Sequence, residues 1–108
     1  MDIQEYQNKA TRTLKPNTLT SELEKEMCFG LVGETGEVID ILKKYLYQNH
    51  PLDKEHLKEE LGDVCWYLCN LATITGIDMN DVLNNNIKKL MKRYPEGFSA
   101  ERSINRNE

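Results

Sequence analysis

Apolar side chains recur every three or four residues along most of the chain, which is the spacing of one face of an α-helix. No segment alternates between apolar and polar residues as a half-buried strand would. The pattern predicts four helices, over residues 2–14, 20–47, 54–75 and 78–94. Three prolines fall between or after these segments, where helices are expected to end. The predicted fold class is therefore all-α.

The second and third predicted helices are long, and the loop between them is short. Such a connection forces neighbouring helices to run antiparallel, so we expect a bundle of four to five helices built around this central pair. The segment 63–74, DVCWYLCNLATI, is apolar on nearly every side of the third helix. In a domain this small, another subunit is expected to cover such a helix, which predicts an oligomer. The polar segment 99–108 is predicted to be a tail that is either loose or dependent on a partner.

Two helix starts carry capping signals. Thr20 or Ser21 is predicted to cap the second helix, with Glu24 completing a capping box behind Ser21. Asp78 is predicted to cap the fourth helix. These residues set the expected boundaries of the helices that follow them.

Length and charge narrow the class of protein. The chain has 108 residues, which is one domain, and a net charge of −4. An acidic chain argues against a binder of nucleic-acid polymers or membrane surfaces, and no apolar run is long enough to span a membrane. The first residues lack the features of a signal peptide, and three cysteines do not suit a disulfide framework. We therefore expect a cytoplasmic protein with free, mostly buried thiols.

Four acidic residues interrupt or border the apolar stripes of the two long helices. Glu34 and Glu37 lie three residues apart in the second helix, and Glu60 and Asp63 repeat this spacing in the third. Residues three apart share a helix face, so two antiparallel helices can bring all four carboxylates to one point. Oxygen ligands without His or Cys suit Mg²⁺ or Mn²⁺. The alternative is that these are solvated surface charges, which is the usual state of acidic residues on helices.

The glycines at positions 30, 33 and 36 lie inside the second helix, beside these carboxylates. Each lowers helix propensity by about 1 kcal/mol relative to Ala, so a compensating role is expected. Either close packing of a neighbouring helix or close approach of a ligand would explain them.

Several residues are candidates for binding an anionic substrate. On the fourth helix, Asn86 interrupts the apolar stripe, and Lys89 and Arg93 follow on the same side. An amide with two cations can hold phosphate oxygens, although the cations also suit the end of a helix dipole. Lys44 is a weaker phosphate candidate, and Trp66 can either stack on a base or belong to the core.

Two segments carry a family resemblance. GLVGETGEVIDILKK (30–44) followed by KEELGDVCWYL (58–68) resembles the MazG-like, all-α nucleoside triphosphate pyrophosphohydrolases. Their signature is ExxE followed by ExxD, and here 22 residues separate the two motifs. The segments 5–13 and 86–98 also look like elements of this family. Gly33 departs from the family, because many members have an acidic residue immediately before the first Glu.

The resemblance implies a domain over residues 1–98 that hydrolyses a nucleoside triphosphate to the monophosphate and pyrophosphate. It implies Mg²⁺, with Mn²⁺ as a substitute, bound by Glu34, Glu37, Glu60 and Asp63. It also implies a housekeeping role in the nucleotide pool and a homo-oligomer, either a dimer or a dimer of dimers. Two other classes remain open: a non-catalytic oligomeric adaptor, and a di-iron bundle, although the latter normally contains His in its motifs.

Overall fold

The computed structural model describes residues 1–106, which contain helices and no strand. The helices are α1 (Ile3–Thr11), α2 (Thr20–Tyr47), α3 (Lys54–Ile74), α4 (Met79–Arg93) and α5 (Ala100–Ile104). The all-α prediction is confirmed, and α1 ends three residues earlier than expected. Part of the predicted loose tail instead forms α5, capped by the Ser99 side chain. Residues 107 and 108 of that tail lie outside the described residues.

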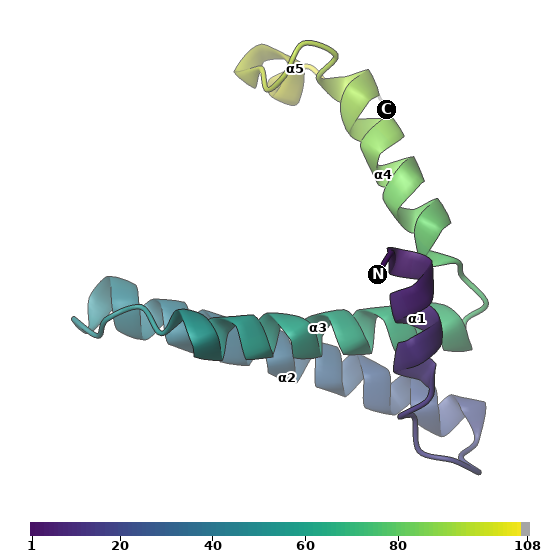
Figure 1. The fold of residues 1–108 in the computed structure, drawn as a ribbon. Coiled ribbons are helices and arrows are strands. Elements are labelled where there is room, and N and C mark those ends of the chain that lie inside the picture. Colours follow the sequence, from purple (N-terminus) through teal and green to yellow (C-terminus); the bar gives the residue numbers. More distant parts are fainter. Residues whose placement is uncertain (107–108) are drawn as a thin grey trace.

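Helices α2 and α3 lie side by side over most of their length (Figure 1). The ring of Tyr67 on α3 packs directly against the backbone of Gly30 on α2, where an added Cβ would collide with it. Further along α2, Glu34 meets Glu60 and Asp63 of α3. Between the contact of Gly30 with Tyr67 and the acidic cluster, residue numbers increase along α2 and decrease along α3. The close contact of Tyr67 with Gly30 therefore lies one helical turn from the acidic residues.

A buried glutamine joins α1 to the ends of two other helices. The Gln7 side chain is 5% exposed, and its amide nitrogen donates to Thr73 Oγ1 (3.1 Å) and to the carbonyl of Ile77 (2.9 Å). Its amide oxygen accepts from the backbone N–H of Met79 (3.0 Å). The predicted Asp78 cap of α4 is confirmed, since its carboxylate accepts from the N–H of Asn80. Gln7 therefore fixes the turn between α3 and α4.

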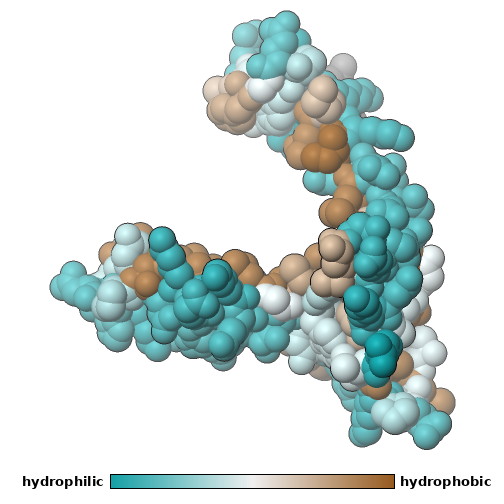
Figure 2. Space-filling model, viewed as in Figure 1, coloured by the Kyte–Doolittle hydropathy of each residue, from teal (hydrophilic) through white to brown (hydrophobic). Residues whose placement is uncertain are grey.

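The single chain is open in shape. From that turn α4 leads away from the α2–α3 pair and carries α5 at its far end (Figure 1). The radius of gyration is 17.2 Å, whereas a compact domain of this length has about 13 Å. Apolar side chains are exposed on the inner side of the bend (Figure 2). Within the described residues, α4 therefore does not pack along the α2–α3 pair, and much of its apolar face remains exposed.

Two local predictions are wrong. The N-cap of α2 is Leu19 and no side chain caps this end, because Thr20 and Ser21 already belong to the helix. The thiols are not mostly buried, since Cys28 and Cys65 are exposed and only Cys69 is buried. Within residues 1–106, no helix is long and apolar enough to cross a membrane.

We expect Gln7→Ala to lower the free energy of unfolding by about 2–3 kcal/mol, because buried groups on α3 and α4 lose their hydrogen-bond partners. Urea unfolding at fixed protein concentration measures this change. Asn8→Ala, at the exposed neighbouring position, is the control and should change stability by less than about 0.5 kcal/mol. Equal effects of the two substitutions would show that the Gln7 hydrogen bonds do not hold α4 in place.

Candidate metal centre

Three of the four candidate carboxylates converge. Oxygen atoms of Glu34, Glu60 and Asp63 lie within 4.8 Å of one another, although the three residues come from two helices. Glu34 and Glu60 are half-buried, whereas Asp63 is exposed. Spacing places them: Glu34 follows Gly30 by one turn, and Asp63 precedes Tyr67 by one turn. The packing of Tyr67 on Gly30 thus sets the two acidic positions opposite each other.

The surroundings of Glu34 favour its protonated form. A hydrogen bond with Glu60, burial, and the nearby negative charges raise the pKa of Glu34 to about 7. Its Oε2 atom is buried and has no hydrogen-bond donor among the described residues. A buried carboxylate oxygen without a donor is costly, so the group must either hold a proton or face a cation.

The donor set fits a hard divalent cation. It consists of carboxylate oxygens alone, which are the ligands that Mg²⁺ and Mn²⁺ prefer. A buried carboxylate oxygen without a hydrogen-bond donor, such as Oε2 of Glu34, is typical of a metal ligand, because a cation would compensate its burial. Glu34, Glu60 and Asp63 could therefore hold one metal ion and leave coordination positions for a phosphate-bearing ligand and water.

Glu37, the fourth candidate carboxylate, lies outside the set of three. It is exposed on α2, one turn beyond Glu34. Its negative charge nevertheless contributes to the raised pKa of Glu34, so it remains electrostatically part of the site. Lys44 lies further along α2 and forms an ion pair with Asp40 at 2.9 Å, which raises the pKa of the lysine.

His56 on α3 contacts one of the clustered carboxylates and was not predicted as a site residue. Its Nε2 lies 3.2 Å from Oε1 of Glu60, one helical turn further along α3. When Nε2 carries the proton, this contact orients the Glu60 carboxylate in the way that outer partners of metal ligands do. The i, i+4 spacing of the two residues on one helix was the available signal.

The predicted substrate-binding residues are spread over the chain. Asn86, Lys89 and Arg93 lie on α4, which projects away from the acidic cluster (Figure 1). Within one chain, the structure therefore does not bring them to the carboxylates. Trp66 is half-buried on α3, and its indole N–H donates to Thr13 Oγ1 at 2.7 Å. Its ring also meets Tyr67 edge to face, with centroids 5.0 Å apart.

The three glycines of α2 do not share one role. Gly30 permits the contact with Tyr67, which supports close helix packing at this position. Gly33 and Gly36 have no atoms within 4 Å of the place where a Cβ would stand. Packing within one chain therefore explains the first glycine and leaves the other two facing open space.

Comparison with known proteins defines the family. Residues 17–98 match the MazG nucleotide pyrophosphohydrolase domain, and the chain belongs to this family. It is 35% identical over 81 residues to the Gene 37 protein of Mycobacterium phage L5, a match that covers 71% of each chain. No solved structure matches significantly. Membership implies a hydrolase that releases pyrophosphate from nucleoside triphosphates, and the acidic cluster is compatible with the divalent metal that the family uses.

The raised pKa of Glu34 generates a prediction for the metal-free protein. Because this pKa is about 7 in the folded chain and 4.5 for an ordinary Glu, the folded state holds an extra proton between these pH values. Stability contributed by this group is therefore greatest below about pH 4.5 and declines as the pH rises towards 7. Urea unfolding from pH 4.5 to 8 measures the decline, and Glu34→Gln should make the profile flatter. A wild-type profile identical to that of Glu34→Gln would contradict the shift.

Proposed function

We propose that this protein is a Mg²⁺-dependent nucleoside triphosphate pyrophosphohydrolase, in which Mn²⁺ can replace Mg²⁺. The observation that carries the proposal is the convergence of Glu34, Glu60 and Asp63, with one buried Glu34 oxygen lacking a donor. The products are the nucleoside monophosphate and pyrophosphate. A housekeeping role in the nucleotide pool and a cytoplasmic location follow from this reaction as parts of the proposal.

The four carboxylates have two roles in this proposal, which are binding of the metal ion and positioning of the attacking water. Glu34, Glu60 and Asp63 serve as metal ligands, and His56 holds the Glu60 carboxylate in its orientation. When bound, the divalent cation supplies charge neutralisation for the triphosphate and lowers the pKa of a coordinated water. Glu37 stands beside the set with its carboxylate exposed, so we assign to it the positioning of the attacking water.

The substrate side chains neutralise and orient the phosphates. Asn86, Lys89 and Arg93 offer an amide and two cations along α4, and Lys44 adds a cation from α2. Water attacks the α-phosphorus in line, and pyrophosphate leaves with its bond to that phosphorus broken. Trp66 is placed on α3 three residues beyond Asp63, where its ring can stack on the base. Catalysis of this kind depends mainly on positioning and electrostatics.

A homo-oligomer completes this site in our proposal, as either a dimer or a dimer of dimers. The α2–α3 pair forms an antiparallel hairpin that carries the carboxylates, and α4 of a second copy brings the phosphate-binding residues to it. The exposed apolar side chains support this arrangement, because isolated domains rarely leave so many large ones in water. On α2 and α4 they include Phe29 (77% exposed), Val32 (74%), Ile87 (59%) and Met91 (60%).

We expect Glu60→Gln and Asp63→Asn each to lower turnover by roughly 100-fold or more, because each removes a charged ligand for the metal. Release of pyrophosphate in the presence of Mg²⁺, across all ribo- and deoxyribonucleoside triphosphates, measures the effect and ranks the bases. Glu59→Gln is the matched control, since it removes an exposed charge next to Glu60 and should keep wild-type rates. Near-wild-type rates for Glu60→Gln would refute the assignment of the metal ligands.

The shared site predicts complementation between inactive variants. Glu60→Gln removes a ligand from the hairpin and Lys89→Ala removes a cation from α4, so each homo-oligomer should be inactive. If α4 acts on the neighbouring copy, unfolding and refolding equal amounts of the two variants together should restore about a quarter of wild-type turnover, because about a quarter of the sites then contain neither substitution. Size-exclusion chromatography with light scattering checks the assembly. A monomeric wild-type protein, or no restored activity, would argue against a site built from two copies.

A further inference from the structure

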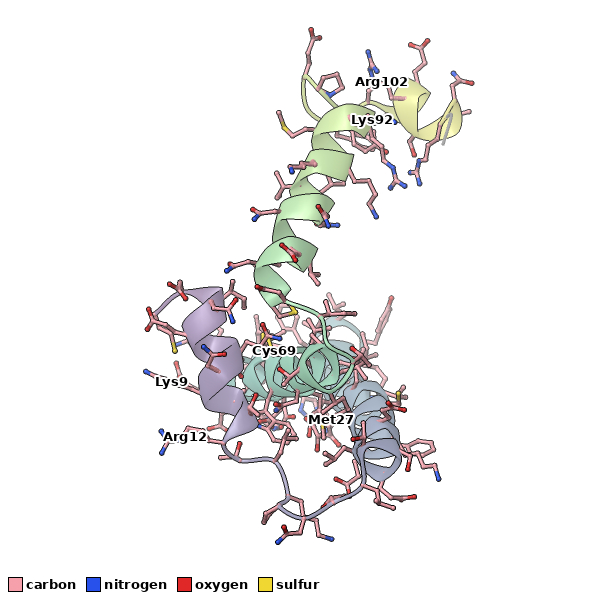
Figure 3. The ribbon with its side chains drawn as sticks, turned by 90° about the vertical axis from the view of Figure 1, so that its right-hand side faces the viewer. Lys9, Arg12, Met27, Cys69, Lys92 and Arg102 are labelled. Carbon is pink, nitrogen blue, oxygen red and sulfur yellow. The ribbon has the colours of Figure 1, made fainter. Side chains whose placement is uncertain are left out.

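A cavity lies far from the acidic cluster, between the end of α4 and α5. It has a volume of about 340 Å³. Four cationic side chains line it, from both helices and from the residue range that follows α5: Lys92, Arg93, Arg102 and Arg106. Glu101 is the one carboxylate of the lining, so the cavity carries a net charge of about +3. Figure 3 shows Lys92 and Arg102 near each other at this end of the molecule.

The positive charge of this region contrasts with the rest of the chain. Residues 86–106 hold six cations and two carboxylates, although the whole protein has a net charge of −4. Residues 1–85 hold eight cations and fifteen carboxylates. Like charges gathered around one cavity repel each other, so the arrangement is more stable with an anion inside it.

Local contacts build the wall of the cavity. Ser99 caps α5 by accepting from the N–H of Arg102. The hydroxyl of Tyr94 hydrogen-bonds with the side chains of Ser103 and Arg106, and these contacts lower its pKa. The ring of Tyr94 also lies against that of Phe98, with centroids 5.5 Å apart. These contacts hold α5 near the end of α4 and keep Arg102 and Arg106 at the cavity.

We propose that this cavity is a binding site for a short polyphosphate, either inorganic pyrophosphate or the phosphate chain of a nucleotide. Arginine forks bind phosphate oxygens in pairs, and a lysine adds a point charge, so the lining matches the chemistry of such an anion. A concave site with cations from two helices suits a short ligand. A nucleic-acid polymer would extend beyond it and meet the negative charge of the remaining chain.

The cavity shares Arg93 with the residues that we assign to the substrate phosphates, but it contains none of the proposed metal ligands. The residues of α5 lie outside the segment 17–98 that matches the MazG family, and the carboxylates of α2 and α3 do not line the cavity. Binding there requires no metal and no hydrolysis. Binding without metal tests the cavity and turnover with Mg²⁺ tests the proposed reaction, so the two proposals can fail separately although Arg93 belongs to both.

Isothermal titration calorimetry of the full chain in EDTA tests the proposal, with pyrophosphate, a non-hydrolysable nucleoside triphosphate analogue and the bare nucleoside as separate titrants. We expect pyrophosphate and the analogue to bind, and the nucleoside not to bind. The double variant Arg102→Gln/Arg106→Gln should weaken binding by about tenfold or more, because two charge-assisted contacts are lost. Glu101→Gln should tighten it by about threefold, because the one opposing charge is removed.

The matched control is Lys25→Gln/Lys58→Gln, which removes the same amount of charge from exposed lysines of α2 and α3. It should leave the affinity within about twofold of wild type, as should Glu60→Gln. Pyrophosphate and the analogue binding equally would identify the phosphates as the ligand, and binding of the analogue alone would identify the nucleotide. No binding by the wild type, or equal loss in the control, would overturn the proposal. So would tighter binding of a single-stranded oligonucleotide through the same arginines.

Discussion

The contact between the Tyr67 ring and the Gly30 backbone sets the distance between the two long helices, and the acidic site depends on that distance. With no Cβ at position 30, the ring lies directly on α2. One turn away, the same close approach forces Glu34 towards Glu60 and Asp63, whose oxygens gather within 4.8 Å. Packing energy from an aromatic ring thus supports a concentration of negative charge that would otherwise separate the helices.

The acidic site lies in a chain that has only a small buried core. Within the described residues, the buried apolar core consists of only a few side chains: Ala10, Met27, Ile41, Cys69, Ala72 and Met79. Gln7 supplements it with directed hydrogen bonds, which position α4 without enclosing it. The chain therefore has a well-defined local geometry at the acidic cluster and at the α3–α4 turn, while much of its apolar surface remains in contact with water.

The helix positions and the convergence of the carboxylates could be predicted from the sequence, because both follow from the 3.6-residue period of the α-helix. Spacing placed Glu34, Glu60 and Asp63 on facing sides, but it could not show that Glu37 stays outside the set of three, since this depends on the rotation of α2 against α3. The direction of α4 could not be predicted from the sequence either. It is determined by Gln7, a polar residue whose partners lie 66 to 72 positions away. The α5 helix was missed because five polar-rich residues carry no periodic signal.

The hydrogen bonds of Gln7 also constrain the order in which the chain becomes structured. They connect the first helix to the beginning of the fourth, across 72 residues of a 108-residue chain. During synthesis, α1 leaves the ribosome early but lacks its partners until the end of α3 and the start of α4 have followed. The long hairpin can pair before that point, because its contacts are closer in sequence. Carboxylates from α2 and α3 can therefore be brought together before Gln7 fixes the position of α4.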